Sequence, residues 1–204
     1  MQNITILLGT KNQNKVKELK KIADKAIGTS IQLISLNDLP YVEEPLENGN
    51  TFYENALIKA KYYYQVYQMP VITDDSGLCV DALKGRPGVF SARYASQNTH
   101  DAPDAANRMK LLDEMKDVKE RNAHFCCSMV FYDGSQIIVS EGKLEGKILT
   151  REVGKNGFGY DALFLPLGYH QSLGELDEDT KNQMSHRFRA FNQLLEKLKK
   201  VFYW

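Results

Sequence analysis

The sequence lacks long apolar segments and has no excess of one sign of charge. No apolar run approaches the roughly 20 residues that are needed to cross a bilayer, and the first run, Ile4 to Leu8, has the length of a strand. No basic segment precedes that run, so we expect no signal peptide. The 26 basic residues are balanced by 26 acidic ones, which argues against nucleic-acid binding by bulk electrostatics. We therefore expect a cytoplasmic protein without nucleic-acid or membrane partners.

Cysteine is also scarce. The chain has three cysteines, Cys79, Cys126 and Cys127, and none of them forms the CxxC spacing that is typical of zinc sites. All three lie in apolar runs. We expect buried thiols in a reducing cytosol, rather than a disulfide or a zinc site.

Apolar periodicity predicts alternating strands and helices along one α/β unit. Strands are expected at Ile4–Leu8, at Ile31–Leu36, in a hairpin of Ala123–Tyr132 and Gln136–Val139, and at Leu163–Leu165. The second strand of the hairpin could continue beyond Gly142 toward Ile148. Helices are expected after Lys15, from Thr51, over Asp101–Lys116 and from Ser185 to the C-terminus. We find no internal repeat and no low-complexity linker.

Two adjacent carboxylates, Asp74 and Asp75, follow the short apolar run at Val71, and another apolar run begins at Leu78. The pattern predicts strand, acidic turn, strand. Two neighbouring carboxylates repel each other unless a proton or a cation such as Mg²⁺ lies between them. Arg93 adds a cation next to a possible phosphate site. Taken alone, Asp-Asp-Ser-Gly is equally typical of a surface turn.

A polar loop joins the first strand to the first helix. Thr10, Asn12 and Lys15 offer a hydroxyl, an amide and a cation beside a helix N-terminus, which suits a phosphate. The loop is not a Walker A motif, because Asn14 stands where that motif has glycine and Val16 where it has Ser or Thr. An ordinary helix start with solvated lysines fits this stretch as well.

The helix from Thr51 places two polar side chains on one face, because Asn55 and Lys59 are four residues apart. Thr51 and Glu54 have the spacing of a capping box, so capping alone accounts for Glu54. Glu47 precedes the helix and could point toward the same region.

Two further stretches could bind a flat ligand. Glycines flank Phe158, and an exposed ring beside the carboxylate of Asp161 suits a nucleobase; the ring could equally anchor a tight turn. His186 and Arg187 begin the last helix, where the helix dipole disfavours cations. This placement indicates a nearby anion or electron-rich ligand, unless both side chains are simply solvated.

Five segments in order resemble the inosine triphosphate pyrophosphatase family, the Ham1-like pyrophosphatases of non-canonical purine nucleotides. They are GTKNQNK, ENGNTFYENALIKA, DDSGLCVDALKGRPGVFSARYA, GFGYDALF and KNQMSHRFRA, and the resemblance runs from about Leu8 to Leu195. It implies a single domain over residues 1–204 with two α/β lobes around a long, twisted mixed sheet and a central active-site cleft. It also implies homodimers that hydrolyse ITP, dITP and XTP to the monophosphate and pyrophosphate with Mg²⁺.

The resemblance also implies roles for individual residues. Asp75 would be the proton acceptor, supported by Asp74, and Glu47 and Asp75 would hold the metal. The expected substrate contacts are the phosphate loop Thr10, Lys11, Asn12, Gln13, Asn14 and Lys15; then Lys59, Ser76 and Arg93; and a base pocket of Phe158, Gly159, Tyr160, Asp161, Lys181, His186 and Arg187. The sequence departs from the family pattern at Ala162, which often is proline, and at Phe188, where bacterial members usually have glycine.

Two alternatives stay open at this point. One is a related pyrophosphatase that acts on other modified nucleotides. The other is a nucleotide sensor on the same fold that binds without turnover, although such a protein has no need of the set formed by Glu47, Asp74, Asp75 and Lys59.

Overall fold

The computed structural model describes residues 4–27, 31–96 and 101–202, and it has an α/β fold with a mixed sheet. In chain order the main elements are β1 (Ile4–Leu8), α1 (Gln13–Ile27), β2 (Ile31–Ser35), α2 (Phe52–Tyr67), β3 (Val71–Val80), α3 (Asp104–Glu114), β4 (Asn122–Tyr132), β5 (Ile137–Ile148), β6 (Phe164–Pro166), α4 (Glu178–Met184) and α5 (His186–Phe202). The sheet order is β2-β1-β3-β4-β5-β6. β1 pairs in parallel with β2 and β3, whereas β5 and β6 are antiparallel. The predicted fold class is therefore confirmed.

The chain divides into two compact units. Unit 1 comprises Met1–Asp75, Cys127–Gly142 and Arg187–Trp204, and unit 2 comprises Ser76–Cys126 and Lys143–His186. The boundaries fall inside β3, β4 and β5, so each of these strands contributes residues to both units.

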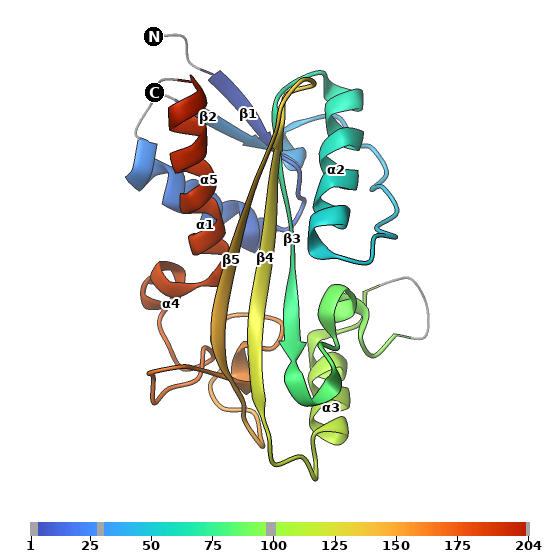
Figure 1. Cartoon of the computed structure of the whole chain (residues 1–204), viewed down its shortest axis with the longest axis vertical. Coiled ribbons are helices and arrows are strands. Elements are labelled where there is room, and N and C mark those ends of the chain that lie inside the picture. Colours follow the sequence, from blue (N-terminus) through green and yellow to red (C-terminus); the bar gives the residue numbers. More distant parts are fainter. Residues whose placement is uncertain (1–3, 28–30, 97–100, 203–204) are drawn as a thin grey trace. The chain divides into compact units, whose positions relative to one another are not determined.

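In unit 1, helices cover both faces of the sheet (Figure 1). On one face α1 and α5 pack against Leu8 and Ile72, and on the other face α2 packs against Leu7 and Val71. Neighbouring residues of β1 and β3 thus belong to opposite cores, as expected when successive side chains of a strand point to opposite faces. The two helix layers set up two different environments for the polar residues farther along β3.

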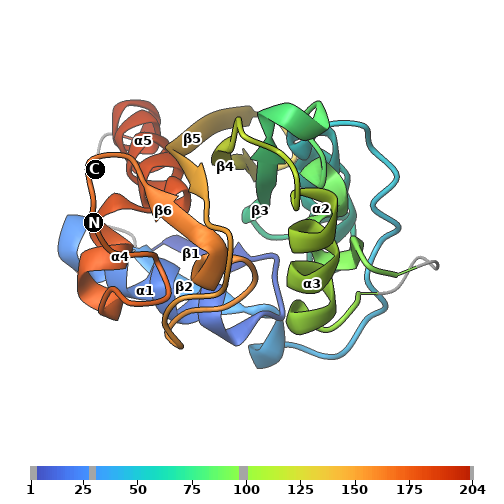
Figure 2. The same ribbon diagram turned by 90° about the horizontal axis from the view of Figure 1, so that it is seen from below.

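Unit 2 has its own apolar core. Leu111 and Met115 at the end of α3 pack against Leu78 of β3, Phe125 of β4 and Phe164 of β6. Figure 2 shows α3 and β6 in a view turned by 90° from Figure 1. The same core contains Tyr160 and Leu163, so it fixes the segment before β6 on which the predicted base-pocket residues Phe158 to Asp161 lie.

The prediction of an acidic turn between two short strands is wrong. Val71 to Val80 form one continuous ten-residue strand, and Asp74 and Asp75 lie in its middle rather than at a strand end. Asp, Ser and Gly are turn residues because they bond their own backbone. Here the side chains of both aspartates have partners from other elements, and the strand continues.

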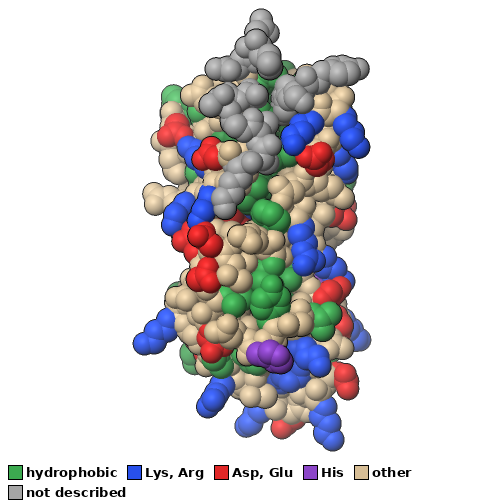
Figure 3. Space-filling view, turned by 90° about the vertical axis from the view of Figure 1, so that its left-hand side faces the viewer, with side chains coloured by type: hydrophobic (Ala, Val, Ile, Leu, Met, Phe, Trp, Pro, Cys, Tyr) green, Lys and Arg blue, Asp and Glu red, His purple; other side chains and the backbone are tan. Residues whose placement is uncertain are grey.

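The surface carries charges of both signs. Lys and Arg side chains are scattered among Asp and Glu side chains on the face drawn in Figure 3, in keeping with the zero formal net charge. Among the residues that the structure describes, no helix combines the length and the apolar character of a membrane span.

Candidate active site

The two adjacent aspartates of β3 face opposite sides of the sheet. The Asp74 carboxylate contacts Lys15 of α1 and Arg187 of α5, whereas the Asp75 carboxylate contacts Asn55 and Lys59 of α2. The alternation of a strand requires this arrangement. Each carboxylate therefore has its own nearest partners, although the charge of Lys59 also acts on Asp74 and that of Lys15 on Asp75.

Asp74 lies in a closed network of charges within unit 1. Its Oδ2 is 2.8 Å from the Lys15 ammonium and 3.5 Å from Nε of Arg187, whose Nη1 donates to Glu18 Oε2 at 2.6 Å. Only 2% of the Asp74 side chain is exposed. Burial alone would raise the pKa of Asp74, but the positive charges of Lys15 and Arg187 lower it well below its ordinary value. Asp74 thus stays ionised, and its negative charge holds α1 and α5 against β3.

Arg187 was predicted to read a base, and the structure places its guanidinium in this buried network. Its side chain is 4% exposed, and the carboxylates of Glu18 and Asp74 raise its pKa against the opposing effect of burial. His186 lies in unit 2, where its ring stacks on Phe125 with centroids 4.9 Å apart. The two consecutive residues therefore have different surroundings.

The group of charges around Asp75 differs from the one around Asp74. Its Oδ2 accepts a hydrogen bond from Asn55 Nδ2 at 3.0 Å, and its Oδ1 is 4.0 Å from the ammonium of Lys59, which is 3.0 Å from Glu47 Oε2. One ammonium therefore faces two carboxylates. Burial raises the pKa of Asp75, and the charge of Glu47 raises it further against the effect of Lys59. A carboxylate that binds protons more readily than usual is suited to accept one.

Helix α2 positions this second group. The Thr51 hydroxyl caps the helix by accepting from the backbone N–H of Glu54, and the Glu54 carboxylate accepts from the N–H of Asn50. One turn later, Asn55 Oδ1 accepts from the N–H of Gly49, which ties the segment after Glu47 to the helix. Asn55 and Lys59 are four residues apart and face β3 together, as their spacing predicted.

The predicted phosphate loop, Thr10 to Lys15, is held in shape by its own side chains. Asn12 Oδ1 accepts from the backbone N–H groups of Asn14 and Lys15 and so caps α1, and Thr10 Oγ1 accepts from the N–H of Asn12. Lys15 reaches Asp74, as described above. Gln13 begins the helix. The loop is thus wound into a turn in which Asn12, Gln13 and Asn14 are exposed, whereas Thr10, Lys11 and Lys15 are half-buried.

Two residues of this loop region are fixed by neighbours. The Lys11 ammonium donates to the carbonyl of Val42, lies 3.4 Å from Glu44, and sits over the ring of Tyr41. A Cβ on Gly9 would lie 2.6 Å from Cγ2 of Thr73 on β3. Gly9 is therefore required for the close approach of the loop to the strand that carries the aspartates.

Unit 2 contains the second predicted group, built around Asp161. The buried Asp161 carboxylate accepts from the backbone N–H of Phe158 at 2.8 Å and from the Lys181 ammonium at 2.5 Å. The same ammonium lies 4.7 Å from the centre of the Phe158 ring. A Cβ on Gly157 would lie 2.1 Å from Asp161 Oδ2, so glycine is needed there. This geometry presents a half-buried aromatic ring beside a cation.

The remaining predicted residues of unit 2 have varied surroundings. The N–H of Gly159 donates to Asp104, and the Tyr160 hydroxyl donates to the carbonyl of Ser91. Arg93 lies over the ring of Phe90, and Ser76 is a half-buried residue of β3 directly after Asp75. Each unit thus contains its own group of predicted site residues, and the predicted central cleft between lobes stays a prediction.

Glu18 and Asn55 were not among the predicted site residues. Glu18 is a buried carboxylate on α1 that pairs with Arg187, and Asn55 is the direct hydrogen-bond partner of Asp75. The spacing of Asn55 from Lys59 was a usable signal. Nothing in the sequence around Glu18 sets it apart from the exposed charges of the same helix.

Comparison with known proteins extends these observations. A family model described as the Ham1 family matches residues 6–197. A dITP/XTP pyrophosphatase of Clostridium tetani is 43% identical over 199 residues, which cover 96% of this chain and 96% of the relative. A dITP/XTP pyrophosphatase of Halalkalibacterium halodurans is 44% identical over 191 residues, 92% of this chain and 95% of the relative. The structure of the Staphylococcus aureus Ham1 protein superimposes with a TM-score of 0.84 at 34% identity, covering 97% of this chain and 99% of that protein.

Proposed function

The chain belongs to the Ham1 family, and we propose that it hydrolyses non-canonical purine nucleoside triphosphates such as dITP, ITP and XTP. The products would be the nucleoside monophosphate and pyrophosphate. The relatives named dITP/XTP pyrophosphatases support this activity, because they are similar to the chain over nearly its whole length.

One observation carries the proposal. The ammonium of Lys59 lies beside the carboxylates of both Glu47 and Asp75, and the pKa of Asp75 is raised by burial and by the charge of Glu47. The two carboxylates offer the oxygen ligands that a hard divalent cation such as Mg²⁺ prefers. Glu47 and Asp75 would hold it, and a bound Mg²⁺ would offset charge on the phosphate oxygens.

Asp75 would act as the general base. We propose that its Oδ atoms accept the proton of the water that attacks the α-phosphorus, while pyrophosphate leaves with the electrons of the broken bond. Asn55 holds this carboxylate in place through its amide. Asp74, kept ionised on the other face of β3, would support the site by holding Lys15 and Arg187.

Positive charge near the leaving group would come from two lysines. Lys59 borders Asp75 and Glu47, and Lys15, although it pairs with Asp74, is near enough for its charge to lower the pKa of Asp75 as well. Each would reduce the charge that develops on pyrophosphate in the transition state. The remaining loop residues would then position the triphosphate through their side chains.

The base would be bound by the Phe158 loop in unit 2. Phe158 would stack on the purine, and Lys181 or His186 would face the 6-oxo group. Adenine has a 6-amino group in the place of the 6-oxo group. Its N–H donors would then face the N–H donors of Lys181 or His186, with no acceptor between them. A buried polar group without a partner costs about 1–3 kcal/mol, enough for roughly tenfold to hundredfold rejection of ATP.

Product analysis tests the proposal. Purified protein would be incubated with ITP, XTP, GTP and ATP, with and without Mg²⁺, and released pyrophosphate and orthophosphate would be measured separately. We expect pyrophosphate from ITP and XTP, dependent on Mg²⁺, and little product from GTP or ATP. Release of orthophosphate would show that water attacks a phosphorus other than the α-phosphorus. Binding of ITP without turnover would point to a nucleotide sensor.

The family resemblance also leads us to propose a homodimer in the cytoplasm, with residues 1–204 acting as one functional domain. The balance of 26 basic and 26 acidic residues supports the expectation that neither nucleic acid nor a membrane is a partner. Light scattering behind size-exclusion chromatography would measure the mass in solution; a mass of one chain would contradict the dimer.

A further inference from the structure

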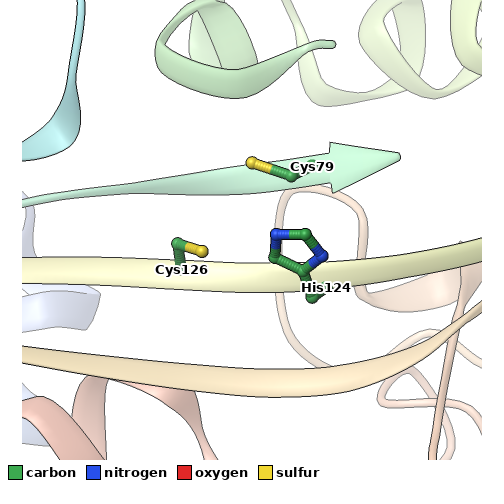
Figure 4. A group of neighbouring side chains, drawn as sticks. All are labelled: Cys79, His124 and Cys126. Atoms are coloured by element: carbon green, nitrogen blue, oxygen red, sulfur yellow. The ribbon is translucent and has the colours of Figure 1, made fainter. Parts of the chain in front are cut away.

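A cluster of two cysteines and one histidine lies on the sheet of unit 2, apart from the residues of either group described above. Cys79 extends from β3, and His124 and Cys126 extend from β4 toward it (Figure 4). One ligand atom from each side chain lies within 4.8 Å of the other two. Cys79, His124 and Cys126 are called the thiol–imidazole cluster below.

The cluster occupies the outer face of these strands. Leu78, Val80 and Phe125 alternate with its members and point into the core of unit 2. The three side chains themselves are half-buried, so solvent reaches them. The expectation that all three cysteines are buried is therefore wrong for Cys79 and Cys126, and it holds only for Cys127. Half-buried thiols on an outer face add little to the core.

The geometry points to a transition-metal site, and we propose that the thiol–imidazole cluster binds one Zn²⁺ ion with a water molecule as fourth ligand. Tetrahedral zinc with bonds of about 2.3 Å to sulfur requires sulfur atoms about 3.8 Å apart. The side chains therefore need to close by at most about 1 Å. A set of two thiolates and one imidazole binds zinc in preference to magnesium.

Asp81 provides an outer partner for the imidazole. Its Oδ1 lies 3.7 Å from Nδ1 of His124. Carboxylates commonly orient a metal-bound histidine through its second nitrogen, and their loss weakens metal binding about 10–100-fold. The charges of Lys143 and Glu145, which also face this region, would stay at the rim.

Cobalt substitution tests the site. Full-length protein, reduced and freed of metal with a chelator, would be titrated with Co²⁺ and monitored by absorption. We expect one Co²⁺ per chain with a thiolate-to-cobalt charge-transfer band and intense tetrahedral d–d bands. Co²⁺ held only by the carboxylates near Lys59 would give no thiolate band, and that result would overturn the proposal.

Variants locate the ligands. Cys79→Ser, Cys126→Ser and His124→Ala should each abolish the charge-transfer band. Asp81→Asn should weaken Zn²⁺ affinity, measured against a chromophoric chelator, by about 10–100-fold. Cys127→Ala is the matched control, because Cys127 follows Cys126 directly but is buried in the core of unit 1. A band that survives in Cys79→Ser, or that disappears in Cys127→Ala, would contradict the assignment.

A measurement on the wild-type chain tests the proposed site even where the variants fold poorly. Stoichiometric Zn²⁺ should protect Cys79 and Cys126 from a thiol-alkylating reagent, as read by mass spectrometry of peptides. Equal alkylation with and without Zn²⁺ would overturn the proposal.

Discussion

On the α1 and α5 side of β3, the Asp74 carboxylate lies beside two cations, Lys15 and Arg187. On the α2 side, the Asp75 carboxylate lies beside the Lys59 ammonium and near a second carboxylate, that of Glu47, while the more distant charge of Lys15 acts on it as well. The two residues are chemically identical and adjacent, and both have little exposed side chain, 2% for Asp74 and 14% for Asp75. Their pKa values nevertheless move in opposite directions, down for Asp74 and up for Asp75.

The difference shows that the number of positive partners, rather than burial alone, decides what a carboxylate does at this site. Burial raises the pKa of both. Where positive charges outweigh burial, the carboxylate is a structural anchor. Where they do not, it retains affinity for a proton, as a general base requires.

The largest expected effect comes from removing the carboxylate on the α2 side. Asp75→Asn keeps the size of the side chain but removes the proton acceptor. We expect kcat for ITP to fall about 10²–10⁴-fold, while the circular dichroism spectrum stays unchanged. Asp113→Asn, an exposed change on α3, is the control; comparable residual activity in the two variants would refute the base assignment.

The corresponding change on the other face should act on stability. Asp74→Asn leaves Lys15 and Arg187 facing a neutral amide, and removing one partner of a buried ion pair costs about 3–5 kcal/mol. Because the pKa of Asp74 is lowered in the folded state, this stability is present above its ordinary pKa of 3.8 and is lost as pH falls further. Urea unfolding at pH 7 would measure the cost of the substitution, and unfolding at about pH 2.5, below the ordinary pKa, would measure how far the difference from the wild type shrinks.

The control for that experiment is Asp24→Asn, an exposed carboxylate on α1, which should change the unfolding free energy by less than about 0.5 kcal/mol. If Asp74→Asn were equally mild at pH 7, the network would not hold the helices as described.

Much of this arrangement could be predicted from the sequence, but the decisive part could not. Apolar periodicity located β1, α1, β4 and β5, and the spacing of Asn55 and Lys59 placed both on one face of α2. The continuous strand through Asp74 could not be predicted, because the segment has the composition of a turn. Contacts with α1, α2 and α5 stabilise the extended conformation instead.

Long-range pairs explain most of what was missed. Glu18 and Arg187 are separated by 169 positions, and no local pattern links them. The thiol–imidazole cluster was missed for a similar reason, since zinc motifs are recognised by spacing along one segment, whereas these ligands come from two strands. Side-chain contacts across the sheet decide both features.

A smaller effect is expected from the cation of the α2 side. Lys59→Met leaves Glu47 and Asp75 without their ammonium, so the pKa of Asp75 should rise further. An opposite charge at this distance typically lowers a carboxyl pKa by about 1–3 units. We therefore expect the acid limb of the kcat/KM profile to move to higher pH by about that amount.

Lys61→Met, on the exposed side of the same helix, should leave the limb where it is. A Lys59→Met profile with an unmoved limb would show that the limb belongs to another group.

The smallest expected effect concerns the start of the helix that carries Asn55 and Lys59. Thr51→Ala removes the hydroxyl that caps α2, and loss of such a cap costs about 1 kcal/mol. Thermal or urea unfolding would detect it, and Thr51→Ser should restore the stability. A loss in both variants would show that the cap is not responsible.

The most direct test of the account is the pH dependence of stability of Asp75→Asn relative to the wild type. The raised pKa of Asp75 means that its contribution to stability is present below the ordinary pKa of 3.8 and is lost as pH rises through the folded value. Urea unfolding at pH 4 and pH 8 should therefore show Asp75→Asn gaining on the wild type as pH rises, whereas the deficit of Asp74→Asn should stay nearly constant over this range, because Asp74 titrates below it. If the difference between Asp75→Asn and the wild type were equally constant, the two faces of β3 would not differ, and Asp75 would be a second structural anchor.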